Sequence, residues 1–100
     1  MPELIPNKKF LDDLAKRQRD AALVKKIAKA LALLEANPRH PGLRIERIVN
    51  DPAAWSARIE KRCRLSFEPT AYLDSGAPDW TQPLLLLRIL DHDDLYRSPH

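Results

Sequence analysis

The sequence has one cysteine, no long apolar run and no internal repeat, and each absence narrows the class of protein. The single cysteine, Cys63, cannot form an internal disulfide and fits a reducing compartment, so we expect a cytoplasmic protein. No apolar stretch approaches the roughly 18 residues that a membrane-spanning helix needs, so no membrane association is expected. The first residues lack a cationic start followed by an apolar run, and we expect no signal peptide.

The composition predicts one folded domain over residues 1–100. Hydrophobic residues make up 44% of the chain and charged residues 31%, which is typical of a globular protein with a single core. Residues 1–64 hold 15 Lys and Arg against 8 Asp and Glu, whereas residues 65–100 hold 2 against 6. A basic region of this kind can bind phosphates or an acidic protein partner. For the lysines of the predicted helices, ordinary solvated charge is the simpler interpretation.

The stretch 55–67 predicts a β-hairpin with a row of cations on one face. Apolar residues alternate along it: Trp55, Ala57, Ile59, Cys63, Leu65 and Phe67. The other face then carries Ser56, Arg58, Glu60, Arg62, Arg64 and Ser66. A period of two is the pattern of a half-buried strand, with a turn at 60–62. One sheet surface therefore packs on a core, while Arg58 and Arg64 project toward a partner.

The remaining elements follow from apolar spacing and from residues that break helices and strands. In chain order, we expect an extended start at 3–5, a helix from Asn7, a second helix from Asp20 to Asn37, a strand at 43–46, the hairpin, an irregular connection at 69–82, a central strand at 83–90 and a loose tail at 97–100. Trp80, in the connection, either folds back on the core or is an exposed contact residue. The predicted fold class is α+β, with an N-terminal helical hairpin on one face of a mostly antiparallel sheet of four to five strands.

Four short motifs occur in order along the chain: F-L-x-x-L at 10–14, A-N-P-x-H-P-G-L at 36–43, W-S-A-R-I with R-C-R-L-S-F at 55–67, and H-D-D-L-Y at 92–96. Together they resemble the RelE/ParE superfamily of toxins from bacterial type II toxin–antitoxin modules. The similarity covers residues 4–96. Cys63 stands where an aromatic residue is usual, and the long connection at 74–82 departs from the family pattern.

The resemblance implies a fold, an activity and partners. RelE-like members cleave messenger RNA, usually on the ribosome and without a metal or cofactor. ParE-like members share the fold but inhibit DNA gyrase, and both kinds are neutralised by an antitoxin. We therefore expect a toxin that is a ribosome-dependent mRNA endoribonuclease, either a monomer or part of a toxin–antitoxin hetero-oligomer. The alternatives are a ParE-like gyrase inhibitor and a module that binds an antitoxin without toxicity.

The predicted catalytic residues are Arg58, Arg64, His92 and Tyr96. Guanidinium groups stay charged and can grip two phosphate oxygens, which suits Arg58 and Arg64 to the transition state of phosphodiester cleavage. An unperturbed histidine titrates near neutrality, at roughly pH 6.5, and the aspartates around His92 favour an acid role. Tyr96 could stack on a base. The predicted RNA-binding residues are Arg44, Arg47, Arg62 and Arg88. Arg88 joins the catalytic face if Leu85, Leu87 and Ile89 all face the helices.

Each of these assignments has a structural alternative. The two arginines could pair with carboxylates across the sheet, at Glu46, Glu60 or Glu68. His92 could cap loop carbonyls, Tyr96 could pack its ring on the core, and the Cys63 thiol is interpreted as buried and inert. Asp91, Asp93 and Asp94 beside His92 do not predict a metal site, because one consecutive segment rarely closes a coordination sphere.

Overall fold

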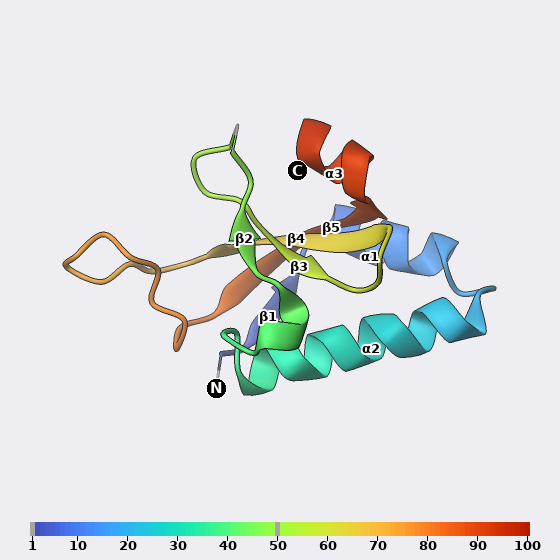
Figure 1. Cartoon of the computed structure of the whole chain (residues 1–100), viewed down its shortest axis with the longest axis horizontal. Coiled ribbons are helices and arrows are strands. Elements are labelled where there is room, and N and C mark those ends of the chain that lie inside the picture. Colours follow the sequence, from blue (N-terminus) through green and yellow to red (C-terminus); the bar gives the residue numbers. More distant parts are fainter. Residues whose placement is uncertain (1, 50) are drawn as a thin grey trace.

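The computed structural model describes residues 2–49 and 51–100, and it contains a five-stranded sheet with helices on both of its faces (Figure 1). The elements in chain order are β1 (Leu4–Pro6), α1 (Lys8–Lys16), α2 (Ala21–Ala36), the 3-10 turn η1 (Pro41–Leu43), β2 (Glu46–Arg47), β3 (Trp55–Arg58), β4 (Cys63–Pro69), β5 (Leu84–Asp91) and α3 (His92–Arg97). The strand order is β1-β5-β4-β3-β2; β1 and β5 are parallel, and the other neighbours are antiparallel. The predicted α+β class, with a helical hairpin on one face of a mostly antiparallel sheet, is confirmed.

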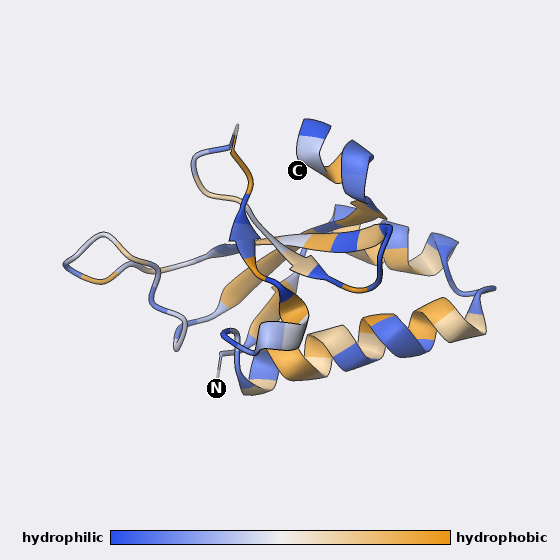
Figure 2. Cartoon of the chain, viewed as in Figure 1, coloured by the Kyte–Doolittle hydropathy of each residue, from blue (hydrophilic) through white to orange (hydrophobic). Residues whose placement is uncertain are grey.

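The two N-terminal helices begin where the sequence predicts. The Asn7 side chain accepts a hydrogen bond from the Phe10 amide, and the Asp20 side chain accepts one from the Leu23 amide. Each bond satisfies an amide that the first turn of a helix leaves without a partner. Hydrophobic and hydrophilic bands alternate along α2 (Figure 2), and its buried residues Ile27, Ala30 and Leu34 belong to the main core. None of the helices among residues 2–49 and 51–100 has both the length and the apolar character required to cross a membrane.

A register shift in the centre of the sheet changes which side chains of β5 face the helices. The pairing of β4 with β5 is irregular between Ser66 and Phe67. Leu84, Leu86 and Ile89 therefore pack in the main core beneath α1 and α2, whereas Leu85, Leu87 and Leu90 lie in a second cluster with α3. The predicted common face for Leu85, Leu87 and Ile89 is wrong, because the bulge interrupts the period of two.

The C-terminal residues are packed rather than loose. The α3 helix covers the sheet face opposite α2 and buries Leu95 (Figure 1). Beyond it, the buried Ser66 hydroxyl donates to the Pro99 carbonyl at 2.5 Å, and the His100 imidazole lies 2.6 Å from the Asp51 carboxylate. The expectation of a loose tail at 97–100 is therefore wrong.

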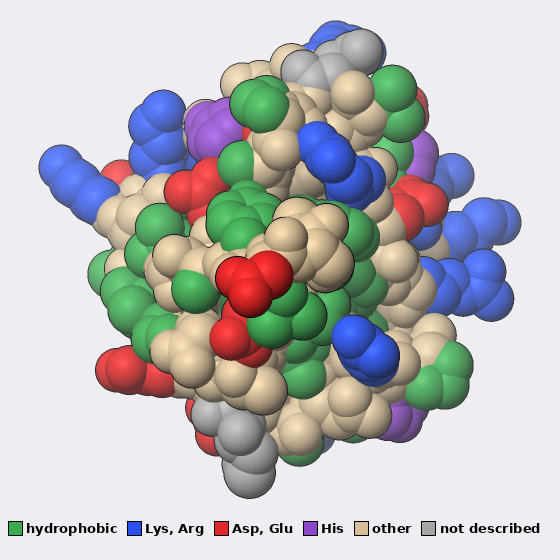
Figure 3. Space-filling view, turned by 90° about the vertical axis from the view of Figure 1, so that its left-hand side faces the viewer, with side chains coloured by type: hydrophobic (Ala, Val, Ile, Leu, Met, Phe, Trp, Pro, Cys, Tyr) green, Lys and Arg blue, Asp and Glu red, His purple; other side chains and the backbone are tan. Residues whose placement is uncertain are grey.

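The connection between β4 and β5 forms a projecting arm whose last part returns to the core (Figure 1). Tyr72 bridges to Pro78, and Gly76 adopts a φ of 88° at the tip. The side of the molecule that carries this arm shows hydrophobic side chains gathered in the middle together with Asp and Glu, and most Lys and Arg toward its edges (Figure 3). Trp80 packs edge-on against Trp55, with ring centroids 5.2 Å apart. The first of the two interpretations of Trp80, that it folds back on the core, is the one observed.

Candidate functional site

Arg58 and Arg64 lie directly opposite each other on β3 and β4, in the register that the hairpin pattern predicts. Like charges at directly opposed positions destabilise a sheet, so such a pair needs a compensating role or partner. Glu60 instead pairs with Lys26 of α2 at 3.0 Å. Among residues 2–49 and 51–100, no carboxylate lies within 4 Å of either guanidinium. The structure therefore does not contain the ion pairs that would explain the two arginines as sheet stabilisers.

Arg64 and His92 line one hollow of about 550 Å³, which we call the Arg64 hollow. Its wall consists of Lys61, Arg62, Arg64, Asp91, His92 and Asp93. One guanidinium nitrogen of Arg64 donates to the carbonyls of the hairpin turn, at 3.1 Å to Lys61 and 3.2 Å to Cys63. These bonds hold the half-buried side chain in one position over the turn. The other guanidinium nitrogens have no hydrogen-bond partner in the described part of the chain and can meet an anion.

The α3 helix places a histidine at the same hollow and stacks a tyrosine on that histidine. The His92 amide donates to the Arg62 carbonyl at 2.8 Å, which fixes the start of α3 against the hairpin turn. The His92 ring stacks on the Tyr96 ring, with centroids 4.3 Å apart and planes inclined by 27°. Its Nδ1 atom lies 3.3 Å from Asp93, and 43% of its side chain is exposed. His92 is therefore positioned by its neighbours yet open to a ligand, which is the situation a proton donor requires.

Tyr96 connects this hollow to a carboxylate that sequence reasoning assigned no catalytic role. Its hydroxyl donates to Glu46 of β2 and lies 3.0 Å from the buried Ser56 hydroxyl of β3. Burial, followed by the hydrogen bond to Glu46, raises the pKa of Tyr96 above its ordinary value of 10.0. Tyr96 therefore stays protonated and is unsuited to act as a base, whereas Glu46 is an exposed carboxylate. Glu46 lies opposite Ser56 on the neighbouring strand, and this pairing is the signal that could have identified it. A strand of two residues is too short for the sequence pattern to predict such a pairing.

Arg58 opens into a second hollow of about 470 Å³, which we call the Arg58 hollow. Its charged and titratable wall residues are Lys26, Lys29, His40, Arg58, Glu60 and Lys61. Arg58 is the last residue of β3. Because β2 pairs with Trp55 and Ser56, it does not cover the sheet edge beside Arg58, and the Arg58 side chain shares a hollow with Lys26 and Lys29 of α2. The two predicted catalytic arginines thus share a register position but line different hollows. Lys61 contributes to both walls.

Of the four predicted RNA-binding arginines, two line a pocket and two bond to other residues of the chain. Arg62 is exposed in the Arg64 hollow, and Arg44 is exposed in a third pocket described below. Arg47 donates to the Pro52 carbonyl at 2.8 Å and so holds its own loop. Arg88 forms an ion pair with Asp13 of α1 at 2.6 Å. The expectation that Arg88 shares the face of His92 is wrong, because its guanidinium turns to α1 instead.

Asp13 is the buried carboxylate that joins α1 to the edge of β5. It accepts two hydrogen bonds from Arg88, at 2.6 and 3.0 Å, and one from the Ile89 amide at 3.0 Å. Burial alone would raise the pKa of Asp13, but the bonds from Arg88 and Ile89 outweigh it and lower the pKa below its ordinary 3.8. β1 pairs with β5 only as far as Leu86, so Asp13 satisfies an edge amide that β1 does not reach.

The remaining candidate groups are a thiol and a set of aspartates. Cys63 is buried as expected, and desolvation raises the pKa of its thiol above 9.0. A thiol in this state is a poor nucleophile. Within residues 2–49 and 51–100, the structure has no group of three or more His, Cys, Asp or Glu side chains arranged to hold a metal ion.

Comparison with known proteins identifies the fold. No family model matches the chain, and no curated protein is similar to it in sequence. Among solved structures, the YoeB/ParE toxin from Agrobacterium tumefaciens is 23% identical with a TM-score of 0.69, covering 90% of this chain and 98% of that one. A chain of the DinJ–YafQ complex from E. coli is 15% identical with a TM-score of 0.71, covering 95% of this chain and 98% of that one. The YoeB dimer from Staphylococcus aureus is 18% identical with a TM-score of 0.60, covering 91% and 97%. The fold of this chain is therefore the RelE/ParE-like toxin fold that the sequence motifs indicate.

Proposed function

We propose that the protein is the toxin of a type II toxin–antitoxin module and cleaves messenger RNA on the ribosome in the cytoplasm. The observation that carries the proposal is the arrangement around Tyr96. Its hydroxyl bonds Glu46, its ring stacks on His92, and His92 shares a hollow with Arg64. A carboxylate, an imidazole and a guanidinium are the three groups needed for phosphodiester cleavage by an RNA 2′-hydroxyl.

The proposed reaction uses each group once. Glu46 takes the proton of the 2′-hydroxyl, whose oxygen attacks the adjacent phosphorus. Arg64 stabilises the charge that develops on the phosphate oxygens, and a fixed guanidinium in place before the reaction requires little reorganisation. The bond from phosphorus to the 5′-oxygen breaks, and protonated His92 gives its proton to that oxygen. The products are a 2′,3′-cyclic phosphate and a 5′-hydroxyl, and no metal or cofactor takes part in any step.

Two features support an antitoxin as the partner. Similar folds occur in the DinJ–YafQ toxin–antitoxin complex from E. coli and in the YoeB–YefM complex from Staphylococcus aureus. An apolar groove of about 420 Å³ runs between β1, α1 and α2, and Leu11 at its border is half exposed. An amphipathic segment of a partner can bury such a surface. Co-purification with the product of an adjacent reading frame, lost in Leu11→Glu, would support this partner; unchanged co-purification would count against the groove.

Induced expression in a bacterial host tests the proposed activity against two alternatives. Rapid arrest of translation, with messenger RNA cut at the ribosomal A site, is the expected result. The similar fold described as YoeB/ParE keeps a gyrase inhibitor as the second candidate, and filamentation with SOS induction and uncut mRNA would indicate it. Unaffected growth with normal antitoxin binding would indicate a module without toxicity. Either of these last two outcomes would overturn the nuclease proposal.

A further inference from the structure

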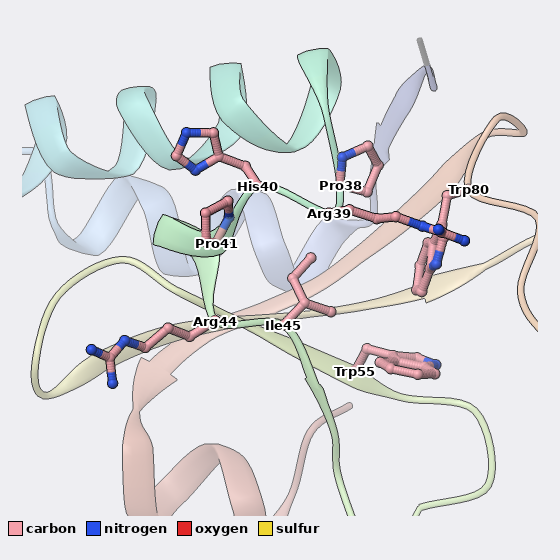
Figure 4. A pocket seen from close by; sticks show the side chains of 8 residues that line it. All are labelled: Pro38, Arg39, His40, Pro41, Arg44, Ile45, Trp55 and Trp80. Atoms are coloured by element: carbon pink, nitrogen blue, oxygen red, sulfur yellow. The ribbon is translucent and has the colours of Figure 1, made fainter.

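A third pocket, which we call the tryptophan pocket, lies at the end of the sheet away from α3 (Figure 4). Its volume is about 350 Å³. The residues that line it are Pro38, Arg39, His40, Pro41, Arg44, Ile45, Trp55 and Trp80. Trp55 and Trp80 are the two tryptophans of the whole sequence, and neither is fully buried. The pocket therefore presents two aromatic rings and, beside them, the guanidinium of Arg39, whereas the Arg44 side chain extends away from the rings (Figure 4). None of the described residues that line the pocket carries a carboxylate.

The wall opposite the tryptophans is a rigid loop. Asn37 accepts a hydrogen bond from the Arg39 amide, and His40 Nδ1 accepts one from the Gly42 amide, each at 3.0 Å. Two prolines restrict the same segment, at positions 38 and 41. Arg44, which follows it, adopts a φ of 45°, a strained conformation for a residue with a side chain. A pocket built on such a loop loses little conformational entropy when it binds a ligand.

Shared wall residues place the tryptophan pocket next to the Arg58 hollow, and the Arg58 hollow next to the Arg64 hollow. His40 lines both the tryptophan pocket and the Arg58 hollow, and Lys61 lines both the Arg58 hollow and the Arg64 hollow. The one carboxylate of the middle hollow, Glu60, is neutralised by Lys26. The described walls of the three recesses together carry eight Lys and Arg side chains against three carboxylates, those of Glu60, Asp91 and Asp93. Basic grooves that end on aromatic rings are the usual means of binding single-stranded nucleic acid.

We propose that the tryptophan pocket is a subsite for one unpaired nucleotide of single-stranded RNA, with its base against the indole rings and its phosphate at Arg39. Figure 4 shows the Arg39 side chain extending toward Trp80, so one residue supplies the cation beside the aromatic surface. Among residues 2–49 and 51–100, no carboxylate lies within 4 Å of this guanidinium. The RNA identity of the ligand rests on the proposed function, whereas the stacking surface and its cation rest on the geometry alone.

Tryptophan fluorescence tests the proposal directly, because both reporters lie in the pocket. The purified full chain is titrated with an oligoribonucleotide of about eight residues and with an abasic oligomer of equal charge. Stacking predicts quenching by the first and an affinity roughly five- to a hundred-fold weaker for the second, the range expected for one stacked base. Equal affinity for the two oligomers would overturn the subsite. Equal quenching by a polyglutamate peptide would assign the pocket to an acidic protein partner and would overturn it too.

Variants separate the subsite from the catalytic site. Arg39→Gln, at an exposed position, should weaken binding and reduce the salt dependence by about one phosphate contact, a change of about 0.7 in the slope of log K against log salt. Arg19→Gln, exposed between α1 and α2, is the matched control and should bind as wild type does. Arg64→Gln should still quench but not cleave. Cleavage is measured separately, on ribosomes that translate a defined messenger RNA. Quenching by the free oligomer with no cleavage on the ribosome by wild type would refute the nuclease and leave the subsite standing, whereas cleavage on the ribosome with equal affinity for the two oligomers would refute the subsite alone.

Discussion

The buried pair of Asp13 and Arg88 gives the sharpest stability prediction. Asp13→Ala removes three hydrogen bonds and leaves the Arg88 guanidinium and the Ile89 amide without their acceptor. Removing one partner of a buried ion pair costs about 3–5 kcal/mol. The side chain of Arg88 is 21% exposed and can regain some water, so we expect the lower end, about 3 kcal/mol. For a domain of this size, that loss lowers Tm by roughly 12–24 °C.

Urea unfolding followed by circular dichroism measures this loss, and the neighbouring Asp12→Ala is the matched control. Asp12 is exposed on the same helix, and its removal should change the free energy of unfolding by less than about 0.5 kcal/mol. Arg88→Met should cost a similar amount to Asp13→Ala, and the double variant should cost clearly less than the two single losses combined. Additive losses, or an Asp13→Ala protein as stable as wild type, would refute the assignment of this pair.

The same pair predicts a dependence on pH. Hydrogen bonds hold the folded-state pKa of Asp13 below 3.8 despite burial, so its stabilising contribution is present above the unfolded-state pKa. The contribution is lost as pH falls through the lower, folded-state value. The difference in stability between wild type and Asp13→Ala should therefore be full near neutrality and shrink below about pH 4. A difference that stays constant down to strongly acidic pH would contradict this explanation.

Four further substitutions or reactions test other parts of the structure. Arg64→Gln should abolish growth inhibition and, by losing bonds to the turn, destabilise the fold by only about 1 kcal/mol in a thermal melt; a soluble variant that remains toxic would refute its role. Tyr96→Phe should keep the stack on His92 but lose the bonds to Glu46 and to the buried Ser56 hydroxyl, so that RNA cleavage slows and the free energy of unfolding falls by about 1–3 kcal/mol; unchanged cleavage would remove Tyr96 from the site. Leu86→Asp should prevent folding, because it places a charge in the main core; a normal melting curve would contradict the burial of Leu86. Cys63 should react with a thiol reagent far more slowly in the native protein than in denaturant, and equal rates would contradict its burial.

Regular patterns in the sequence predicted the elements that share a long apolar face. The spacing of Leu23, Ile27 and Leu34 predicts α2, and the alternation on both sides of residues 60–62 predicts β3 and β4 in their observed register. These segments are long enough for one period to repeat several times. The caps Asn7 and Asp20 were predictable for the same local reason, since a helix start is fixed by the side chain beside it.

Features that depend on contacts between distant residues escaped sequence reasoning. Asp13 and Arg88 are 75 positions apart, and nothing local to Arg88 shows that α1 will supply a carboxylate. The bulge at Ser66 and Phe67 shifts the phase of β5 without a glycine or proline to mark it. The helix α3 has six residues, which is too short for a period of 3.6 to be recognised.

In the candidate site, too, local patterns predicted some residues, whereas the place of others depends on contacts between distant parts of the chain. Arg64, His92 and Tyr96 were selected from the sequence, and the structure brings Arg64 and His92 to one hollow and stacks Tyr96 on His92. Glu46 belongs to the site because the two-residue strand β2 pairs it with Ser56 of β3. Arg58 lies outside the site, because β2 does not cover the sheet edge beside it and its side chain lines the Arg58 hollow instead. The catalytic roles of all these residues stay predictions.

The most direct test of the central claim is the chemistry of the cut ends. The purified protein is added to ribosomes translating a defined messenger RNA, and the fragments are analysed by mass spectrometry. Attack by the 2′-hydroxyl predicts a 2′,3′-cyclic phosphate, a 5′-hydroxyl, and no cleavage when the attacking nucleotide carries a 2′-O-methyl group. Fragments that end in a 5′-phosphate, cleavage that persists on the methylated message, or the absence of any cleavage would contradict the account.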